Sequence, residues 1–158
     1  MKHIETNNIL AVEQFSFRTS LSTENASYKL IDDILNGLNK RMMVGGIFCD
    51  LQKAFDCVNH NILLTKLELY GITGITYKLI KSYLQGRHQR VVLKNHSSGL
   101  CSNWGEITQG VPQGSILGSL LFLLYINDLP QITNDNSKIV LFADDTSMII
   151  TNLKPSDF

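Results

Sequence analysis

The stretch KIVLFADDTSMII, residues 138–150, holds two adjacent carboxylates inside an otherwise apolar run. Two strand-forming segments around a short polar break predict a β-hairpin with Asp144 and Asp145 at its turn. Alternation along the first strand places Val140, Phe142 and Asp144 on one face. Neighbouring carboxylates repel each other, and a divalent cation relieves that repulsion. Taken alone, the pair is more often a solvated turn, because Asp is a favoured turn residue.

A second acidic position follows the apolar strand in GIFCDLQKAFDCVNH, residues 46–60. Asp50 stands at the end of that strand, where a side chain can project from the edge of a sheet. Phe55 and Asp56 follow it closely. Without a ligand, Asp50 would end a strand or cap a helix, and Asp56 would also suit a capping position.

A loop that opens a helix is expected in QGVPQGSILGSLLFLLYINDLP, residues 109–130. Three of its residues exclude regular structure: Gly110, Pro112 and Gly114. Gly114 allows close backbone approach to a ligand, and the Gln113 amide can read a sugar hydroxyl or a base edge. The amides of the helix after Ser115 suit an anion such as phosphate. An ordinary loop before a buried helix remains the alternative.

Composition indicates one globular domain and limits its class. The 158 residues are 44% apolar and 18% charged, with 14 basic and 14 acidic side chains. The absence of a basic surplus argues against a nucleic-acid-binding protein, or else indicates that the basic parts lie elsewhere. Three cysteines without C-x-x-C spacing indicate neither a zinc site nor a disulfide framework. The N-terminus lacks an apolar signal region, so a cytoplasmic or nuclear location is expected and secretion is not.

Hydrophobic periodicity predicts an α+β fold with an antiparallel sheet, because helices and strands do not alternate strictly. The run ILGSLLFLLYI has about half of the roughly 20 residues that span a bilayer, so it predicts a buried helix. The expected elements are helices over 22–40, 59–71, 76–86 and 115–129, strands over 41–51 and 88–94, a strand or hairpin within 99–110, and the hairpin over 138–152. Pro130 is expected to stop the last helix.

Together these stretches resemble the reverse transcriptase of non-LTR (LINE-type, jockey-like) retrotransposons. FCDLQKAFD, QGVPQGSILGSLLFLLYINDLP and LFADD occur in that family's order, and EQFSFRTSLSTENA is similar to its upstream fingers motif. The resemblance runs from about Glu13 to Thr151. Four motifs in register make it specific.

The resemblance implies a two-metal nucleotidyl-transfer site with two Mg²⁺ ions, or Mn²⁺ as an alternative. Asp50, Asp144 and Asp145 would be the catalytic metal ligands, with Asp144 the main ligand of the pair and the Leu51 carbonyl an extra one. An RNA template, a DNA primer and dNTPs would be the partners, and no membrane is expected.

The nucleotide site implied by the resemblance adds four residues. Phe55 would be the aromatic gate that excludes a ribose 2′-hydroxyl. Gln113 and Gly114 would line the incoming nucleotide, and Arg18 would lie near the template or triphosphate.

The implied fold is a polymerase palm, an antiparallel sheet packed on helices, with partial fingers and no thumb. Residues 1–158 would form one reverse transcriptase domain fragment, in which 1–40 are partial fingers and 41–158 are the palm with finger-side insertions. Ser16 and Ser119 depart from the family pattern, which usually has Gly and Pro there.

Two alternatives to an active reverse transcriptase remain open. One is a truncated, catalytically inactive remnant with at most weak nucleic-acid binding. The other is an RNA-copying polymerase or another palm-fold nucleotidyltransferase, which a bulky gate at Phe55 disfavours.

Overall fold

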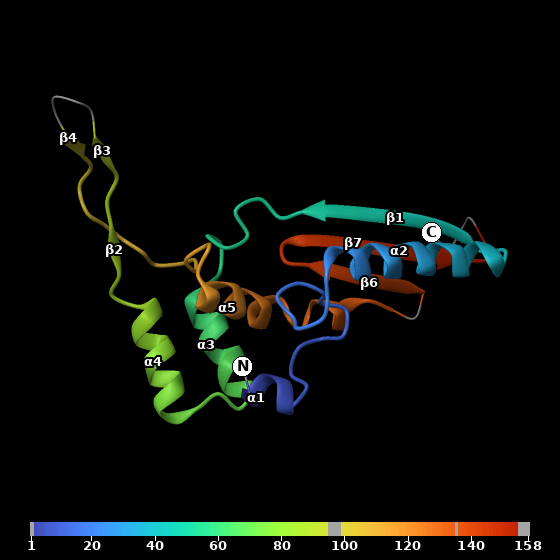
Figure 1. The fold of residues 1–158 in the computed structure, drawn as a ribbon, viewed down its shortest axis with the longest axis horizontal. Coiled ribbons are helices and arrows are strands. Elements are labelled where there is room, and N and C mark those ends of the chain that lie inside the picture. The colour runs from blue at the N-terminus through green and yellow to red at the C-terminus, as the bar shows by residue number, and fades with distance from the viewer. Residues whose placement is uncertain (1, 95–98, 135, 155–158) are drawn as a thin grey trace.

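The computed structural model describes residues 2–94, 99–134 and 136–154. Figure 1 shows an elongated molecule with a sheet and one long helix at one end, and several helices and a thin β-ribbon at the other. The helices are α1 (Lys2–Thr6), α2 (Thr23–Asn39), α3 (His60–Leu69), α4 (Gly74–Leu84), α5 (Ile116–Ile126) and the 3₁₀ turn η1 (Leu129–Ile132). The strands are β1 (Met43–Asp50), β2 (His88–Gln89), β3 (Val92–Lys94), β4 (Gly99–Cys101), β5 (Gly105–Glu106), β6 (Ser137–Phe142) and β7 (Asp145–Asn152).

The main sheet has three antiparallel strands in the order β1-β7-β6, so the last of the described strands lies in the middle. Its buried side chains are Ile139, Val140, Leu141 and Ile149. A short parallel bridge between Gln14 and Leu141 adds an N-terminal segment to the free edge of β6. The predicted α+β class with an antiparallel sheet is therefore confirmed.

Helix α2 lies along this sheet in Figure 1 and begins with a capping box. The Ser22 hydroxyl accepts from the Asn25 amide, and the Asn25 side chain accepts from the Ser22 backbone N–H, so two otherwise unpaired amides are satisfied. Asp33 fastens the helix to β6: its side chain is 2% exposed and pairs with Lys29 on α2 and, at 3.0 Å, with Lys138 on β6.

Substitution of Asp33 by Asn should lower the free energy of unfolding by about 1–3 kcal/mol, because the buried carboxylate is the shared acceptor of two ammonium groups. The two lysine side chains are 44% and 58% exposed, so they can return to water, which keeps the loss below that of a fully buried pair. Urea unfolding measures the change. Asp32→Asn is the matched control, because the Asp32 side chain accepts from Asn36 on the same helix and forms no ion pair with the described residues. An equal loss in both variants would contradict the role of Asp33.

The helical end has its own core, built from α1, α3, α4 and α5. Helix α3 ends as predicted near Gly71, whose φ is +75°. The Ile72 amide donates to the Leu67 carbonyl and the Gly71 amide to the Glu68 carbonyl, which is a Schellman motif. Asn127, buried after α5, accepts from the Ala11 amide and donates to the Ile9 carbonyl, and thereby ties the N-terminal loop to this core.

The ribbon consists of two short ladders, β2 with β5 and β3 with β4. The single strand expected over 88–94 is interrupted because the Val91 amide donates to the Ser102 hydroxyl instead of a strand partner. The Arg90 guanidinium lies 4.7 Å from the centroid of the Trp104 ring, a cation–π contact between the two sides of the ribbon.

Several boundaries differ from the expected ones. Helix α1 was not expected at all, and α4 begins at Gly74 instead of Thr76. Helix α5 ends at Ile126, and Pro130 lies inside η1 instead of ending α5 directly. The outer limits expected for the domain, residues 1 and 158, fall outside the described residues. Within residues 2–94, 99–134 and 136–154, each helix is too short or too polar to cross a membrane.

Candidate active site

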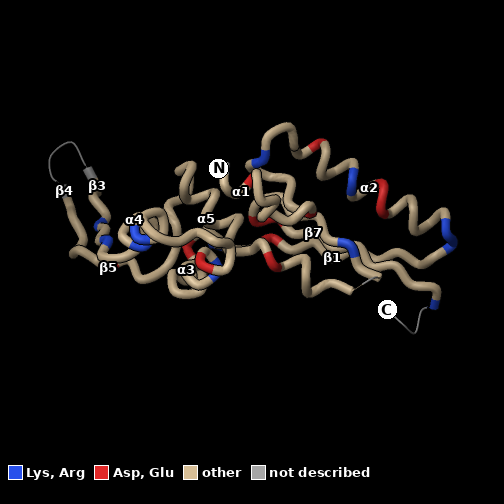
Figure 2. Tube along the Cα trace, turned by 90° about the horizontal axis from the view of Figure 1, so that it is seen from below, with Lys and Arg blue, Asp and Glu red and all other residues tan. Residues whose placement is uncertain are grey.

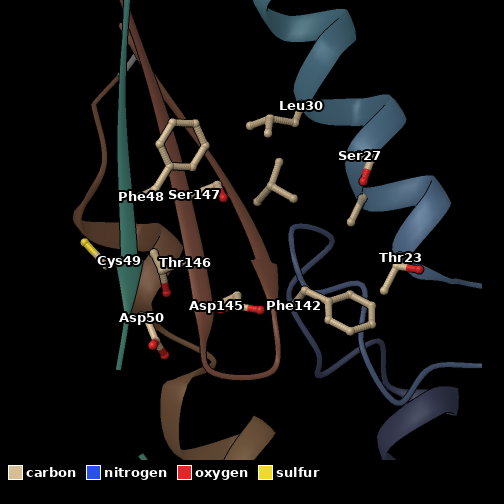
Figure 3. A pocket seen from close by; sticks show the side chains of 12 residues that line it. Thr23, Ser27, Leu30, Phe48, Cys49, Asp50, Phe142, Asp145, Thr146 and Ser147 are labelled. Atoms are coloured by element: carbon tan, nitrogen blue, oxygen red, sulfur yellow. The ribbon is translucent and has the colours of Figure 1, made fainter. Parts of the chain in front are cut away.

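Two of the predicted aspartates meet at the end of the main sheet. Asp50 is the last residue of β1 and Asp145 the first of β7, and the antiparallel register makes them direct partners. Directly opposed residues of neighbouring strands point to the same face, with Cβ atoms about 4.5–5.5 Å apart. Figure 3 shows both side chains at one end of a pocket between the sheet and α2, with Phe142 and Thr23 on the other side.

The third aspartate, Asp144, occupies a different position. Phe142 pairs with Asp145, so Ala143 and Asp144 alone form the loop of the hairpin. Ala143 has φ +55°, a left-handed conformation that costs a residue with a side chain about 1–2 kcal/mol. The alternation of side chains between the two faces of β6 does not continue into this loop. Val140 and Phe142 line the same pocket as Asp50 and Asp145. Asp144 lines a neighbouring pocket. The expected shared face is therefore wrong for Asp144.

The neighbouring pocket gathers four of the predicted residues: Phe55, Gln113, Gly114 and Asp144. Phe55 is 8% exposed, and its ring stacks on Phe122 of α5 with 4.4 Å between centroids. Gln113 and Gly114 are exposed at the mouth. The pocket thus has an aromatic wall, a polar rim and a carboxylate.

Backbone hydrogen bonds fix the two loops that meet at this pocket. The Val111 amide donates to the Phe55 carbonyl at 2.8 Å. Gly110 has φ +89°, and a Cβ there would lie 2.9 Å from the Asp56 carbonyl oxygen, so only glycine fits. The buried His60 ring lies with Nε2 2.8 Å from the Gly110 carbonyl and donates to it. His60 was not predicted as part of the site, because a single histidine at the start of a helix matches no sequence motif.

Helix α5 begins beside the same pocket. Its N-cap Ser115 donates to the Pro112 carbonyl and accepts from the Gly118 amide, each at 2.9 Å. Ser115, Ile116 and Ser119 line the pocket together with Gln113 and Gly114. The first turn of α5 therefore faces the pocket, as expected for a helix that receives an anion.

Two predicted residues lie apart from this group. The Arg18 guanidinium donates to the carbonyls of Ala11 at 2.9 Å and Gln14 at 3.3 Å, and Arg18 lines a third pocket beside α1. Phe17, next to it, lines both the third pocket and the one that contains Asp144. The Leu51 carbonyl accepts from the Ala54 amide at 3.2 Å, which leaves it one free lone pair.

A divalent cation needs several oxygen ligands, and the described side chains supply few of them in one place. Among the described residues, no three His, Cys, Asp or Glu side chains come together as a metal-binding group. The ion pairs of the described residues do not include Asp50, Asp144 or Asp145, so no basic side chain there neutralises them. Figure 2 shows acidic positions near the ends of β1 and β7 and basic ones on α4 and the ribbon. Two opposed carboxylates fit Mg²⁺, which favours one or two carboxylates together with phosphate oxygens and water.

The sequence matches one known protein family over almost its whole length. The family described as "Reverse transcriptase (RNA-dependent DNA polymerase)" matches residues 1–156. The chain therefore belongs to the reverse transcriptase family, and the expected resemblance is confirmed.

The relatives are polymerases of insect transposons. The chain is 34% identical over 145 residues to the probable RNA-directed DNA polymerase from transposon X-element of Drosophila melanogaster, covering 90% of the chain and 15% of that protein. It is 30% identical over 142 residues to the RNA-directed DNA polymerase from mobile element jockey of the same species, covering 86% and 15%. It is 33% identical over 150 residues to the probable RNA-directed DNA polymerase from transposon BS of Drosophila melanogaster, covering 91% of the chain and 16% of that protein. The chain thus spans about 15% of the length of these relatives.

Proposed function

We propose that this chain carries the polymerase active site of a non-LTR retrotransposon reverse transcriptase. It would add dNTPs to the 3′-hydroxyl of a DNA primer on an RNA template. The observation that supports this most is the register that opposes Asp50 and Asp145 beside a pocket lined by Phe55, Gln113 and Asp144. The main sheet would be the palm, and the part before residue 41 a portion of the fingers.

The carboxylates of Asp50, Asp144 and Asp145 would hold two Mg²⁺ ions, for which Mn²⁺ can substitute, with the Leu51 carbonyl as an additional ligand. Bound there, the ions would activate the primer hydroxyl and neutralise charge on the triphosphate and the leaving pyrophosphate. Asp144 lines the pocket that also contains Phe55, Gln113 and Gly114, so its carboxylate would bring a metal ion next to the incoming nucleotide.

The remaining residues would bind and orient the nucleotide. The Gln113 amide and the backbone at Gly114 would approach the sugar and base, and the first turn of α5 would face the phosphates. Phe55 would act as the gate, since its stacking on Phe122 holds the ring in one place. For Arg18 we propose a supporting role: its two carbonyl contacts hold the turn that brings Phe17 to the pocket wall.

Primer extension tests the proposal directly. The purified chain is given poly(A), oligo(dT), dTTP and Mg²⁺, and is compared with its Asp144→Ala variant. Incorporation should fall by about 100-fold or more in the variant, because metal ions contribute several kcal/mol to transition-state stabilisation. Asp32→Ala is the control, since Asp32 on α2 lines neither pocket.

Measurable incorporation that is equal in Asp144→Ala and the native chain would overturn the assignment of the site. No incorporation by either chain would instead favour the inactive remnant. Replacing dTTP by UTP, with the same primer and template, distinguishes a DNA polymerase from an RNA-copying enzyme that makes RNA.

A further inference from the structure

A short N-terminal segment lies against the strand that leads into the aspartate turn. Gln14 forms a parallel bridge with Leu141 of β6. The Phe15 amide donates to the Leu141 carbonyl, and the Leu141 amide donates to the Glu13 carbonyl, both at 2.9 Å. This pairing aligns the side chains after Gln14 with the residues after Leu141.

The side chains of Gln14 and Ser16 continue the contact beyond the end of β6. The Ser16 hydroxyl accepts a hydrogen bond from the Ala143 amide at 2.9 Å. The same hydroxyl donates to Gln14 Oε1 at 2.9 Å, which also accepts from the Ser16 amide at 3.0 Å. Gln14 and Ser16 are each 2% exposed, so water does not compete for these groups. Gln14 therefore orients the Ser16 hydroxyl, whose lone pair accepts the hydrogen bond from the Ala143 amide.

The acceptor lies at the strained residue of the hairpin loop. Ala143 has φ +55° and directly precedes Asp144 and Asp145. A left-handed residue with a side chain persists only where surrounding contacts hold it. The amide of that residue points away from the ladder of β6 and β7 and is bound by Ser16 at 2.9 Å, with Gln14 Oε1 at a longer 3.4 Å.

We propose that Ser16, oriented by Gln14, is a positioning residue for the aspartate turn. Its hydroxyl holds the Ala143 amide, fixes the left-handed conformation there, and so sets the direction of the two carboxylates that follow. The importance of this contact for metal binding rests on the proposed function. The contact itself does not depend on that function.

Amide hydrogen exchange of Ala143 tests the contact. In Ser16→Ala, exchange at Ala143 should rise by about fivefold to tenfold, the factor that corresponds to one hydrogen bond. The Leu141 amide should stay protected, because its bond to the Glu13 carbonyl is retained. Ser16→Thr keeps the hydroxyl and should restore protection at Ala143. Ser16→Cys keeps the shape of the side chain with a somewhat larger sulfur atom and weakens the acceptor, so it replaces Ser16→Ala if that variant does not fold.

The matched control is Ser137→Ala at the opposite end of β6, where the hydroxyl donates to the Asn134 side chain. It should leave Ala143 exchange unchanged. Native exchange at Ala143 in folded Ser16→Ala would overturn the proposal. Equal loss of protection along the whole of β6 and β7 would also overturn it, since that result would show a purely structural role.

Mn²⁺ titration separates this proposal from the proposed function. Ser16→Ala should weaken Mn²⁺ binding by about tenfold, as for other groups that orient metal ligands, and Ser16→Thr should restore it. If Asp50→Asn leaves Mn²⁺ binding unchanged, the metal site fails while the exchange result for Ala143 stands. If Asp50→Asn abolishes binding and Ser16→Ala changes neither binding nor exchange, the metal site stands and the role of Ser16 fails.

Discussion

Replacement of Asp50 or Asp145 by asparagine is expected to weaken Mn²⁺ binding by at least about tenfold, because loss of even an indirect partner of a metal ligand typically costs 10- to 100-fold. The two residues are direct partners across β1 and β7. Asparagine keeps the shape of aspartate and removes the charge, so the sheet register is retained. Each single variant removes one of the two opposed carboxylates, so each should show the full loss of Mn²⁺ affinity on its own.

Water-proton relaxation during a Mn²⁺ titration measures this affinity without any need for polymerase activity. Glu68→Gln on α3 is the control, since it removes one exposed negative charge away from both pockets. A general electrostatic effect would lower the affinity equally in all three variants and would contradict a specific site. Asp144→Asn, measured beside them, reports whether the turn carboxylate joins the opposed pair.

Gly118→Ala is expected to lower the free energy of unfolding by about 1–3 kcal/mol, the usual cost of overpacking a filled site. Helix propensity alone predicts the opposite, because alanine is favoured over glycine in a helix by about 1 kcal/mol. The expected loss of stability, in place of a gain, arises from the loop before α5. A Cβ on Gly118 would lie 2.1 Å from the Pro112 carbonyl oxygen and 2.7 Å from Ser115 Oγ.

The same substitution should also displace Gln113 and Gly114, because the Pro112 carbonyl and the Ser115 hydroxyl anchor the loop that carries them. Urea unfolding measures the loss of stability, and the change in nucleotide affinity follows from dTTP titration. Gly105→Ala is the control, because a Cβ there meets only the Gln89 carbonyl at 3.9 Å. A Gly118→Ala chain more stable than the native one would contradict this prediction, because it would show that the loop before α5 moves aside without loss of stability.

The long regular elements could be predicted from sequence because their signals agree. Helix α2 combines an N-cap serine with helical spacing, and β1 is a continuous apolar strand that ends at Asp50. The apolar run after Ser115 was long enough for a buried helix, and Leu121 to Leu124 are indeed buried. Periodicity did not reveal which side of α2 faces the sheet: Ile31 and Leu35 are more than half exposed.

The site was predictable as a set of residues but not as an arrangement. Alternation could not reveal that Ala143 turns left-handed and sends Asp144 to a pocket other than that of Asp145. The bond from His60 to the Gly110 carbonyl joins residues that are 50 positions apart, and no local pattern predicts such a contact. The motif resemblance predicted that Arg18 lies near the template or triphosphate. It could not predict that its guanidinium donates to the Ala11 and Gln14 carbonyls, because those contacts depend on the path of the N-terminal loop.

The order of strands in the sheet has a consequence for how the chain folds. Strands β6 and β7 are joined by two residues and can pair locally, but β1 finds its partner only after β7 exists. The Ser16 contact with Ala143 spans 127 positions in the chain. Pairings of such long range close late and slow folding. During synthesis, the edge of β1 that pairs with β7 is therefore without its partner until residues 145–152 have followed, and an unpaired strand edge favours aggregation.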